Sequence, residues 1–525
     1  MENNTMNFDL DSQTRRKLGH RLVDVVDSFF ASLPDRPVQP AAEDRYYPAH
    51  QDALPETGED PARVFDEVCR ELMEKGFHIP SANYLGMMNP TPTYMAFLAE
   101  SLVAALNPQL ATLARSQMAS RIEAETVRWI GQLVGWRTPF SGTFTTGGNE
   151  ANLSALAMAL AAKFPGVIED GVCSIGAQPV FYTSVEGHHS LDKSAGLLGL
   201  GRNSLRRIGV NERLELQTPQ LEAAIQQDLL AGRKPFCVVA TAGTTGSGAI
   251  DDLPAISDLC RRYRLWLHVD GAYGAAVLFS RRHRSLVRGI EEADSLSFDP
   301  HKWLAMPFSA GLILTPHIEA LERTFSVPCP YLQKAPPGPL PDNLSIGAQW
   351  SRRMNSLKLW LTLRAHGRRA YEELIDRQMT LARMFADWVA RSDDFELAAP
   401  QVLPILNLRL KAGGSSRLDL QALHAAIIEE VNRDGRQWIS GAMVNGQSVI
   451  RTMVISYLTE DRHLRDLQAA LDASSRAVRT SLRQENRPCI ETAPPQQCGE
   501  ISSSMSGGPG FGRGFPVLLQ ANNAK

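Results

Sequence analysis

The first 80 residues carry two helical patterns separated by a polar stretch. Across Ser12–Leu33, apolar residues recur at three- and four-residue spacing, which is typical of a helix with one buried face: Leu18, Leu22, Val25, Val26, Phe29 and Phe30. Pro34 and Pro37 end this pattern. After a proline- and acid-rich linker, a second helix is predicted at Pro61–Lys75. We therefore treat residues 1–80 as an N-terminal helical segment.

Residues 81–367 alternate between helical patterns and short apolar strands. This alternation predicts an α/β fold, in which helices cover both faces of a mostly parallel sheet. The same stretch is long enough to form the large domain of the chain.

A charged helix begins near Arg368 and opens a smaller α+β domain, residues 368–484. Its strands are expected at Leu403–Leu410 and Val449–Tyr457, and a helix is expected near Arg462–Ala477. The remaining residues, 485–525, are rich in Pro, Gly, Ser and Gln. Such a segment cannot bury enough apolar surface to offset its ordering entropy, so we predict a disordered tail.

The segment Ser295–Trp303 carries the first chemical signal, because it places Lys302 at the end of an apolar run. The apolar residues that follow this lysine would partly remove its amine from water. A desolvated lysine is a nucleophile for carbonyl groups, which is the requirement for a Schiff base. The alternative is a buried structural lysine that pairs with Asp299 or Asp294.

A second signal is Asp270, which ends the apolar strand Leu265–Val269 and is followed at once by small residues. Ligands of open α/β sheets bind beyond the carboxyl ends of the strands. An aspartate at such an end can pair with the protonated ring nitrogen of a pyridine cofactor. The alternative role for Asp270 is the N-cap of a helix.

Two further strand ends carry glycines and hydroxyls. Gly147 and Gly148 precede a helix of strong helix formers, and the free backbone N–H groups of a helix start bind anions. The strand Phe236–Ala240 leads into Thr-Ala-Gly-Thr-Thr-Gly-Ser-Gly. A plain turn is the alternative in both places.

In this order, the four segments resemble the group II pyridoxal-phosphate-dependent amino acid decarboxylases. That family includes glutamate, aromatic amino acid, cysteine sulfinate and diaminobutyrate enzymes. The resemblance runs from about Leu10 to about Ala477, and its most specific parts are His-Val-Asp-x-Ala-Tyr-Gly and Asp-Pro-His-Lys-Trp. It implies fold type I of the PLP-dependent transferases, which is aspartate aminotransferase-like. It also implies a homodimer with active sites at the subunit interface, and an N-terminal segment that wraps around the partner rather than packing on its own domain.

The resemblance also assigns the site residues. Lys302 would bind pyridoxal 5'-phosphate as a Schiff base, and Asp270 would pair with the ring nitrogen. His-x-Ser-x-x-Lys assigns the histidine that stacks on the ring to His188, with His189 as the competing choice. The other implied cofactor contacts are Gly147, Gly148, Asn149, Thr245, Ala272 and His301. The implied reaction converts an L-amino acid into CO₂ and the corresponding amine.

Tyr331 is the expected proton donor to the substrate Cα, and it completes a catalytic set with Lys302, Asp270 and His188. It lies in Pro328–Pro341, a stretch dense in Pro and Gly that lacks periodicity. Long irregular loops of this kind often act as lids, and family members place a tyrosine there in a loop that the neighbouring subunit receives. The alternative is a tyrosine whose ring only anchors the loop.

Two other functions compete with simple decarboxylation. An aldehyde synthase on the same fold couples decarboxylation to oxidative deamination, and a loop tyrosine favours simple decarboxylation instead. A catalytically inactive, cofactor-binding regulatory protein is disfavoured, because every expected catalytic position is occupied.

The motifs leave the substrate open. Asn83–Tyr94 and Asn107–Thr112 correspond to pocket-lining segments of the family and match neither the aromatic nor the glutamate enzymes well. Glutamate decarboxylases hold the substrate carboxylate with an arginine directly before Met-Val-Ile-Ser. Here Thr452 has that place and Arg451 stands one residue earlier. A one-residue shift in a strand reverses the face, which argues against an acidic substrate.

Composition sets limits on partners and location. A chain of 525 residues suggests two or three domains. The net charge of −3 gives no electrostatic case for binding nucleic acid or membranes, and no apolar run approaches the roughly 18 residues of a membrane span. The N-terminus is polar and acidic, unlike a secretory signal. Seven dispersed cysteines without a Cys-x-x-Cys pair suit the cytoplasm and argue against a zinc site, so no metal is expected.

Overall fold

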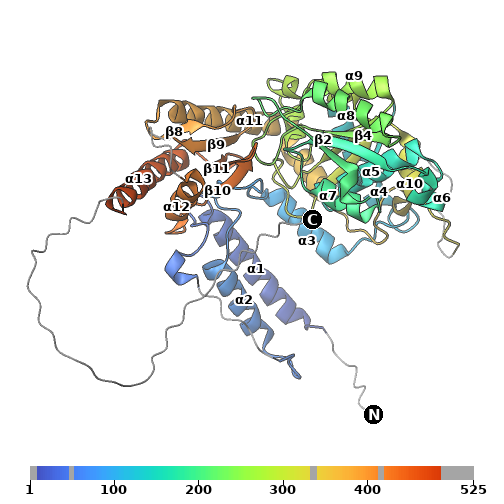
Figure 1. Ribbon diagram of the computed structural model, residues 1–525. Helices are drawn as coiled ribbons and strands as arrows, with labels where there is room; N and C mark the ends of the chain where they lie inside the picture. The colour runs from blue at the N-terminus through green and yellow to red at the C-terminus, as the bar shows by residue number, and fades with distance from the viewer. Residues whose placement is uncertain (1–8, 46–52, 331–339, 412–418, 486–525) are drawn as a thin grey trace, which may run out of the picture. The chain divides into compact units, whose positions relative to one another are not determined.

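The computed structural model describes residues 9–45, 53–330, 340–411 and 419–485. The described residues up to Arg479 form one compact unit that contains two sheets (Figure 1). The predicted disordered tail lies almost wholly outside the described residues. No helix in the described part of the chain has the length and apolar character that crossing a membrane requires.

The helices are α1 (Ser12–Ser32), α2 (Pro61–Lys75), α3 (Tyr94–Leu106), α4 (Gln117–Val134), α5 (Gly148–Lys163), α6 (Val167–Asp170), α7 (Ser190–Leu197), α8 (Thr218–Leu230), α9 (Leu253–Tyr263), α10 (Ile318–Phe325), α11 (Ser356–Arg391), α12 (Leu420–Asn432) and α13 (Asp461–Glu485). The strands are β1 (Ser141–Thr145), β2 (Pro179–Ser184), β3 (Leu205–Ile208), β4 (Lys234–Thr241), β5 (Trp266–Asp270), β6 (Ser295–Phe298), β7 (Gly311–Thr315), β8 (Phe395–Leu397), β9 (Ile405–Leu410), β10 (Ser440–Val444) and β11 (Gln447–Met453).

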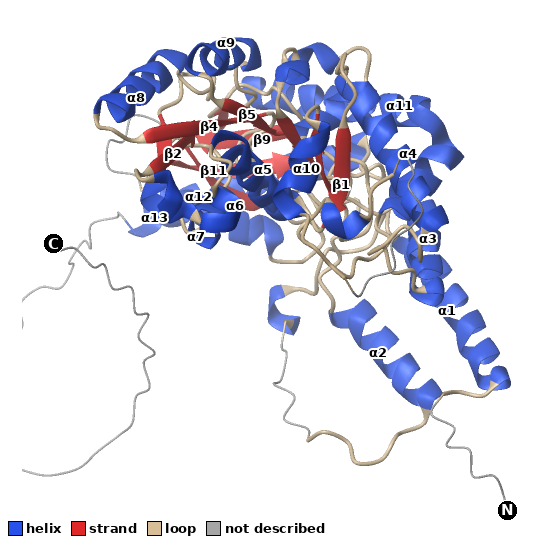
Figure 2. Ribbon diagram, turned by 90° about the vertical axis from the view of Figure 1, so that its right-hand side faces the viewer, coloured by secondary structure: helices blue, strands red, loops and turns tan. Residues whose placement is uncertain are grey.

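The larger sheet has seven strands in the order β1-β7-β6-β5-β4-β2-β3. Its neighbours pair in parallel from β6 to β3, and β7 pairs antiparallel with both β6 and β1. Helices lie on both faces of this sheet (Figure 2). The α/β fold with a mostly parallel large sheet is therefore confirmed.

Strand β4 explains why the sheet is covered on both faces. Cys237 and Val239 pack in a cluster with α5 and α7, whereas Val238 and Ala240 pack in a cluster with α8 and α9. Side chains alternate across a strand, so a strand with helices on both sides must be apolar at every position.

The strand directions position the predicted chemistry. Strands β2, β4, β5 and β6 are parallel to one another. Strand β1 runs in the same direction as β6, because both pair antiparallel with β7, which lies between them. The carboxyl ends of β1, β2, β4, β5 and β6 therefore meet at one edge of the sheet. The segments that leave this edge contain all the predicted site residues that the structure describes.

The smaller sheet is antiparallel, with the order β10-β11-β9-β8. Strands β9 and β11 and helix α13 confirm the three elements expected there, although β11 begins at Gln447 and ends at Met453. On one face of this sheet, Val444 and Val449 pack against Val210, Leu214 and Ala249 of the larger-sheet region. The opposite face contacts α12, since a side chain at Gly441 would meet Ile428.

Helix α11 connects the two sheet regions and is interrupted at Gly367, whose φ of 75° lies in the left-handed region. Gly367 is the residue at which we expected the large domain to end. The domain boundaries after residues 80, 367 and 484 stay predictions.

Helices α1 and α2 match their expected ranges and lie side by side (Figure 1). Asp11 caps α1 by accepting hydrogen bonds from the backbone N–H groups of Gln13 and Thr14, and Asp60 caps α2 in the same way. Neither helix has a fully buried residue.

Candidate active site

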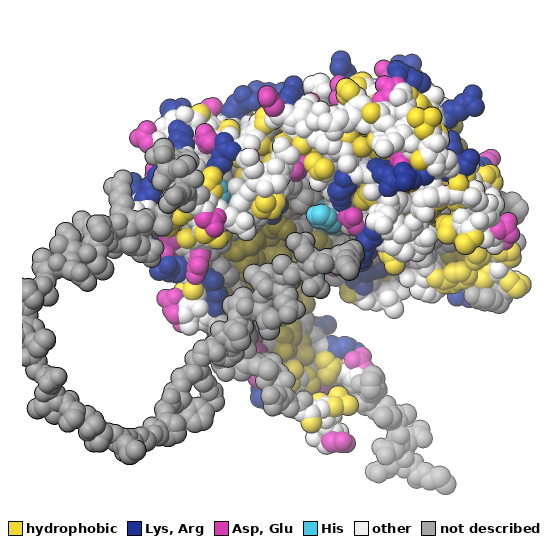
Figure 3. All heavy atoms as spheres, viewed as in Figure 1, with side chains coloured by type: hydrophobic (Ala, Val, Ile, Leu, Met, Phe, Trp, Pro, Cys, Tyr) yellow, Lys and Arg dark blue, Asp and Glu magenta, His cyan; other side chains and the backbone are white. Residues whose placement is uncertain are grey.

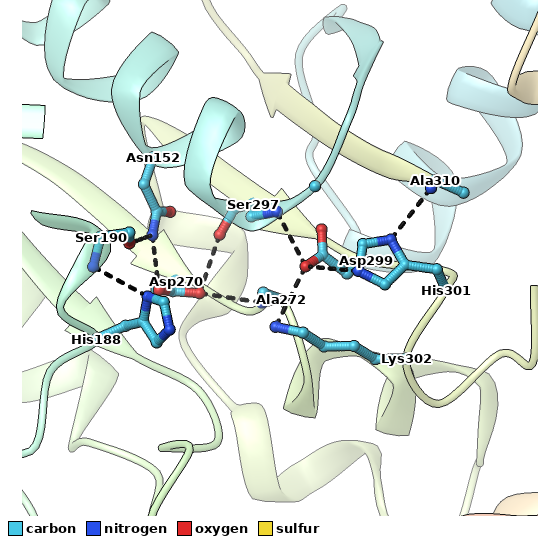
Figure 4. Close-up of polar contacts among 12 residues, drawn as sticks. Asn152, His188, Ser190, Asp270, Ala272, Ser297, Asp299, His301, Lys302 and Ala310 are labelled. Carbon is cyan, nitrogen blue, oxygen red and sulfur yellow. Dashed lines mark hydrogen bonds and ion pairs between the residues drawn. The ribbon is translucent and has the colours of Figure 1, made fainter. Parts of the chain in front are cut away.

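Asp270 lies at the carboxyl end of β5 and is almost completely buried. Its carboxylate accepts hydrogen bonds from Asn152 Nδ2 at 2.8 Å, Ser297 Oγ at 3.1 Å and the Ala272 N–H at 3.2 Å (Figure 4). Burial raises the pKa of Asp270, but the charge of Lys302 and the Asn152 hydrogen bond outweigh it, and the net pKa is lowered. The group is therefore a buried carboxylate that stays ionised.

Lys302 reaches the same region from the loop that follows β6. Its Nζ lies 3.2 Å from Asp299 Oδ2, and the side chain is 20% exposed. The pairing of Lys302 with Asp299, the alternative to a catalytic role, is thus present. The other is absent, since Asp294 pairs with His317 at 2.7 Å. The ion pair with Asp299 is compatible with a Schiff-base role for Lys302, because the pair holds the Lys302 amine near Asp270 (Figure 4).

His188 and His189 are separated clearly by their surroundings. His188 lies beside Asp270, and its Nδ1 accepts a hydrogen bond from the Ser190 N–H at 3.1 Å (Figure 4). Burial lowers the pKa of His188, against the opposing charge of Asp270. The side chain of His189 is 91% exposed and contacts Asp192. The geometry therefore favours His188 as the histidine at the site.

The predicted anion site is the start of α5. Gly147 precedes the helix with φ 150°, and Gly148 donates its N–H to Asp299 Oδ2 at 2.9 Å. A Cβ at Gly148 would lie 3.0 Å from that oxygen and 3.2 Å from the Ala272 Cβ. The absence of a side chain here lets Asp299 and Ala272 approach the helix start closely. Asn149, the next residue, is exposed.

Three other residues that the sequence assigned to the site are His301, Thr245 and Tyr331. His301 is buried near Asp299, with Nε2 3.6 Å from its Oδ2, and burial lowers the pKa of His301. Thr245 follows β4, and its carbonyl accepts a hydrogen bond from Arg451 Nη1 at 2.9 Å. Tyr331 lies outside the described residues.

Several residues that complete the site were not predicted. Asn152 lies one helical turn after Gly148, so it faces the same side of α5, and it also donates to Ser190 Oγ at 3.1 Å. Ser297 lies in β6, two residues before Asp299. Helical periodicity places Asn152 on the Gly148 face of α5, but the contacts of both residues with Asp270 depend on which elements are neighbours.

The one-residue shift of Arg451 argued against an acidic substrate, yet the Arg451 side chain lies against a predicted cofactor contact. It shares the face of β11 that Val449 presents to the larger-sheet region, and its guanidinium reaches Thr245. The residue one position on, Thr452, is on the opposite face, toward α12. The one-residue shift from the glutamate decarboxylase pattern therefore does not by itself turn Arg451 away from the larger-sheet region.

Arg451 is buried, and burial lowers its pKa. Its other contacts are Ser440 Oγ, 3.1 Å from Nε, and Met87 Sδ, beside Nη2. Within the described ranges no carboxylate forms an ion pair with it. A buried guanidinium without a counter-charge is costly, which marks it as a candidate for binding an anion.

These residues fit pyridoxal phosphate. The ionised carboxylate of Asp270 suits a protonated ring nitrogen, Lys302 supplies a primary amine, and the positive end of the α5 helix dipole suits a phosphate.

The chain belongs to the pyridoxal-dependent decarboxylase family, because residues 44–411 match the model of the pyridoxal-dependent decarboxylase conserved domain. It is accordingly a pyridoxal-phosphate-dependent carboxy-lyase that acts on an amino acid.

Named relatives agree with this assignment. The chain is 28% identical over 489 residues to an aromatic-L-amino-acid decarboxylase of Bacillus atrophaeus, and the aligned stretch covers 92% of this chain and 99% of the relative. An acidic amino acid decarboxylase of Homo sapiens is 30% identical over 345 residues, 65% of this chain and 66% of the relative. The crystal structure of Oryza sativa TDC with PLP and tryptamine superimposes with a TM-score of 0.82 at 26% identity, covering 89% of this chain and 99% of that one.

Proposed function

We propose that Lys302 binds the cofactor aldehyde and that Asp270 holds the positive charge of its ring nitrogen. The observation that carries this proposal is the buried, ionised Asp270 beside the Lys302 amine. The start of α5 binds the phosphate, and His188 lies against the ring. When bound, pyridoxal phosphate supplies the electron sink that CO₂ loss requires. The protein contributes orientation of the substrate, a fixed charge and exclusion of water.

We further propose that Arg451 selects a substrate with an anionic side chain. The supporting observations are its burial, its lack of a carboxylate partner in the described part of the chain, and its contact with Thr245. An arginine can hold a carboxylate through two parallel N–H donors, which gives both affinity and orientation.

Wild-type enzyme should release CO₂ from glutamate, aspartate or cysteine sulfinate faster than from tryptophan, tyrosine or diaminobutyrate. Arg451→Met removes the charge at similar length, so kcat/KM for the acidic substrate should fall about a hundredfold, as expected for losing charged hydrogen bonds. Arg409→Met is the matched control, because Arg409 pairs with Glu396 on the smaller sheet. A wild-type preference for aromatic substrates would refute the role of Arg451 while leaving the decarboxylase intact.

Tyr331 remains our proposed proton donor, on the basis of its loop sequence. Tyr331→Phe should still release CO₂, but aldehyde, ammonia and hydrogen peroxide should replace part of the amine. The reason is that the carbanion left at Cα would not be protonated and could react with O₂. Product analysis together with a peroxide assay measures this. Amine as the sole product of Tyr331→Phe would exclude the role, and aldehyde from the wild-type enzyme would identify an aldehyde synthase.

We propose that the enzyme is a homodimer. Two helices carry exposed apolar stripes at four-residue spacing: Val64, Val68 and Leu72 on α2, and Tyr94, Leu98, Leu102 and Leu106 on α3. Hydrophobic side chains are also visible at the surface over the α1–α2 pair (Figure 3). Contiguous exposed apolar surface of this kind is typical of subunit interfaces.

A charge within the α3 stripe should therefore separate the subunits. Leu102→Glu with Leu106→Glu should sediment near the chain mass of 57.8 kDa, and the wild type near twice that value. Leu230→Glu is the control, because Leu230 is 91% exposed on α8, away from both stripes. Equal sedimentation of the stripe variant and the control would count against this interface, as would a monomeric wild type.

We also propose a cytoplasmic location. The supporting observation is that Cys69, Cys173, Cys237, Cys260 and Cys329 are all free thiols in the described structure.

A further inference from the structure

A chain of hydrogen bonds leads from the Asp270 carboxylate into the sheet, away from the cofactor side. Asn152 donates to Asp270, and the Asn152 Oδ1 lies 3.0 Å from His268 Nε2. His268 Nδ1 lies 2.9 Å from Ser295 Oγ, which in turn accepts from Trp266 Nε1 at 2.8 Å. Helix α5 and strands β5 and β6 together hold these five side chains.

The chemistry of the two ends fixes the direction of every bond in this chain. An ionised carboxylate only accepts, so Asn152 must turn its NH₂ group toward Asp270 and its oxygen toward His268. Burial lowers the pKa of His268 to about 4, so its ring is neutral and carries one proton. That proton must be on Nε2, because the Asn152 oxygen can only accept.

The remaining ring nitrogen is then an acceptor. Its partner is the hydroxyl of Ser295, which can donate to His268 because its own lone pair accepts from the Trp266 indole. Every side-chain donor in the chain thus faces an acceptor, although the Ser295 backbone carbonyl, 3.2 Å from Nδ1, receives no hydrogen bond from the ring in this tautomer.

The other tautomer of His268 would disturb Asp270. In that tautomer Nδ1 carries the proton and donates a hydrogen bond to the Ser295 carbonyl, which lies 3.2 Å away. The bare Nε2 would then face the Asn152 oxygen, and the amide would have to turn over. Its oxygen would come to lie about where Nδ2 now is, 2.8 Å from the carboxylate, which is repulsive.

We propose that His268 is a positioning residue: its Nε2–H holds the Asn152 amide in one orientation, and through it keeps the Asp270 carboxylate ionised and presented to the ring nitrogen of the cofactor. His268 acts through Asn152 and Asp270. The proposal rests on the proposed role of Asp270.

Two amide substitutions at residue 268 separate this role from simple packing. His268→Gln places an amide where Nε2 was and can still donate to Asn152. His268→Asn is shorter, places its amide where Nδ1 was, and leaves the Asn152 oxygen without that donor. Thermal unfolding of the full-length apoproteins shows whether both variants fold.

The readout is the affinity of each apoprotein for two ligands, measured by equilibrium titration. One is pyridoxal phosphate, and the other is its 1-deaza analogue, in which C–H replaces the ring nitrogen. Wild type and His268→Gln should bind pyridoxal phosphate more tightly than the analogue. His268→Asn should lose about tenfold to a hundredfold of this preference, the fold-change for one hydrogen bond to a charged group.

The outcomes distinguish the two proposals. A wild type that binds both ligands equally would overturn the proposed role of Asp270 itself. A wild type with the preference, and a His268→Asn variant that keeps it or weakens both ligands equally, would overturn the role of His268 alone. If the residue 268 variants fail to fold, Ser295→Ala tests the same chain, because it removes the hydroxyl that donates to Nδ1. It should lose part of the preference, and full retention would refute the proposal.

Discussion

Replacing Lys302 by alanine should reduce CO₂ release to background while the protein remains folded. Among the described residues at the site, Lys302 carries the amine that can attach the cofactor covalently and release it to the substrate. The fold should survive because Asp299, which loses its ion pair, still accepts from the Gly148 N–H. The measurements are a single-substrate CO₂ assay at saturating cofactor and circular dichroism.

Borohydride reduction followed by peptide mass spectrometry adds a direct test. The cofactor should be trapped on the peptide that contains Lys302 in the wild type, and on no peptide in Lys302→Ala. Lys234→Ala is the control, since Lys234 is exposed at the start of β4. Multiple turnovers by Lys302→Ala would disprove the assignment.

Asp270→Ala should weaken cofactor retention and lower kcat by several orders of magnitude. Without the carboxylate, nothing at the end of β5 keeps the ring nitrogen protonated, and the electron sink is lost. The change also removes one of the two acceptors of the Asn152 amide and leaves Ser190 Oγ as the other. Asp270→Glu should retain partial activity, because the charge survives although the geometry is altered.

The control for Asp270 is another buried carboxylate. Asp251 accepts from the backbone N–H groups of Leu216 and Thr241, and burial raises its pKa to about 6. Asp251→Asn should affect stability more than the cofactor. The measurements are kcat and the rate of cofactor loss on dialysis. Wild-type kcat in Asp270→Ala would contradict the proposed role.

The elements that the sequence predicted well are those with a strong local signal. Helix α2 begins with the N-cap Asp60 and Pro61 and ends at Lys75 before a glycine, so its range was readable. The buried strands β4 and β5 were equally plain as apolar runs that end in motif residues. Strand β10 was missed, although Asn445 and Gly446, both with positive φ, are a typical hairpin turn.

The site followed a similar rule. Motif residues such as Asp270 and Lys302 could be identified by their order along the chain. The hydrogen-bond partners could not, because their roles depend on which strands are neighbours. Ser297 reaches Asp270 only because β5 pairs with β6. Arg451 required the face that β11 turns inward, which neither the motif nor its one-residue shift specifies.

The contact between Arg451 and Thr245 joins a strand near the end of the chain to a loop in its middle. The described residues proposed to hold the cofactor all lie between Gly147 and Lys302, whereas Arg451 and its neighbour Met87 lie outside that interval. Under these proposals, the chemistry and the choice of substrate occupy separate stretches of the gene. Mutation or recombination in the outer stretches could then change which amino acid is consumed without disturbing the reaction, a division of labour that favours rapid diversification.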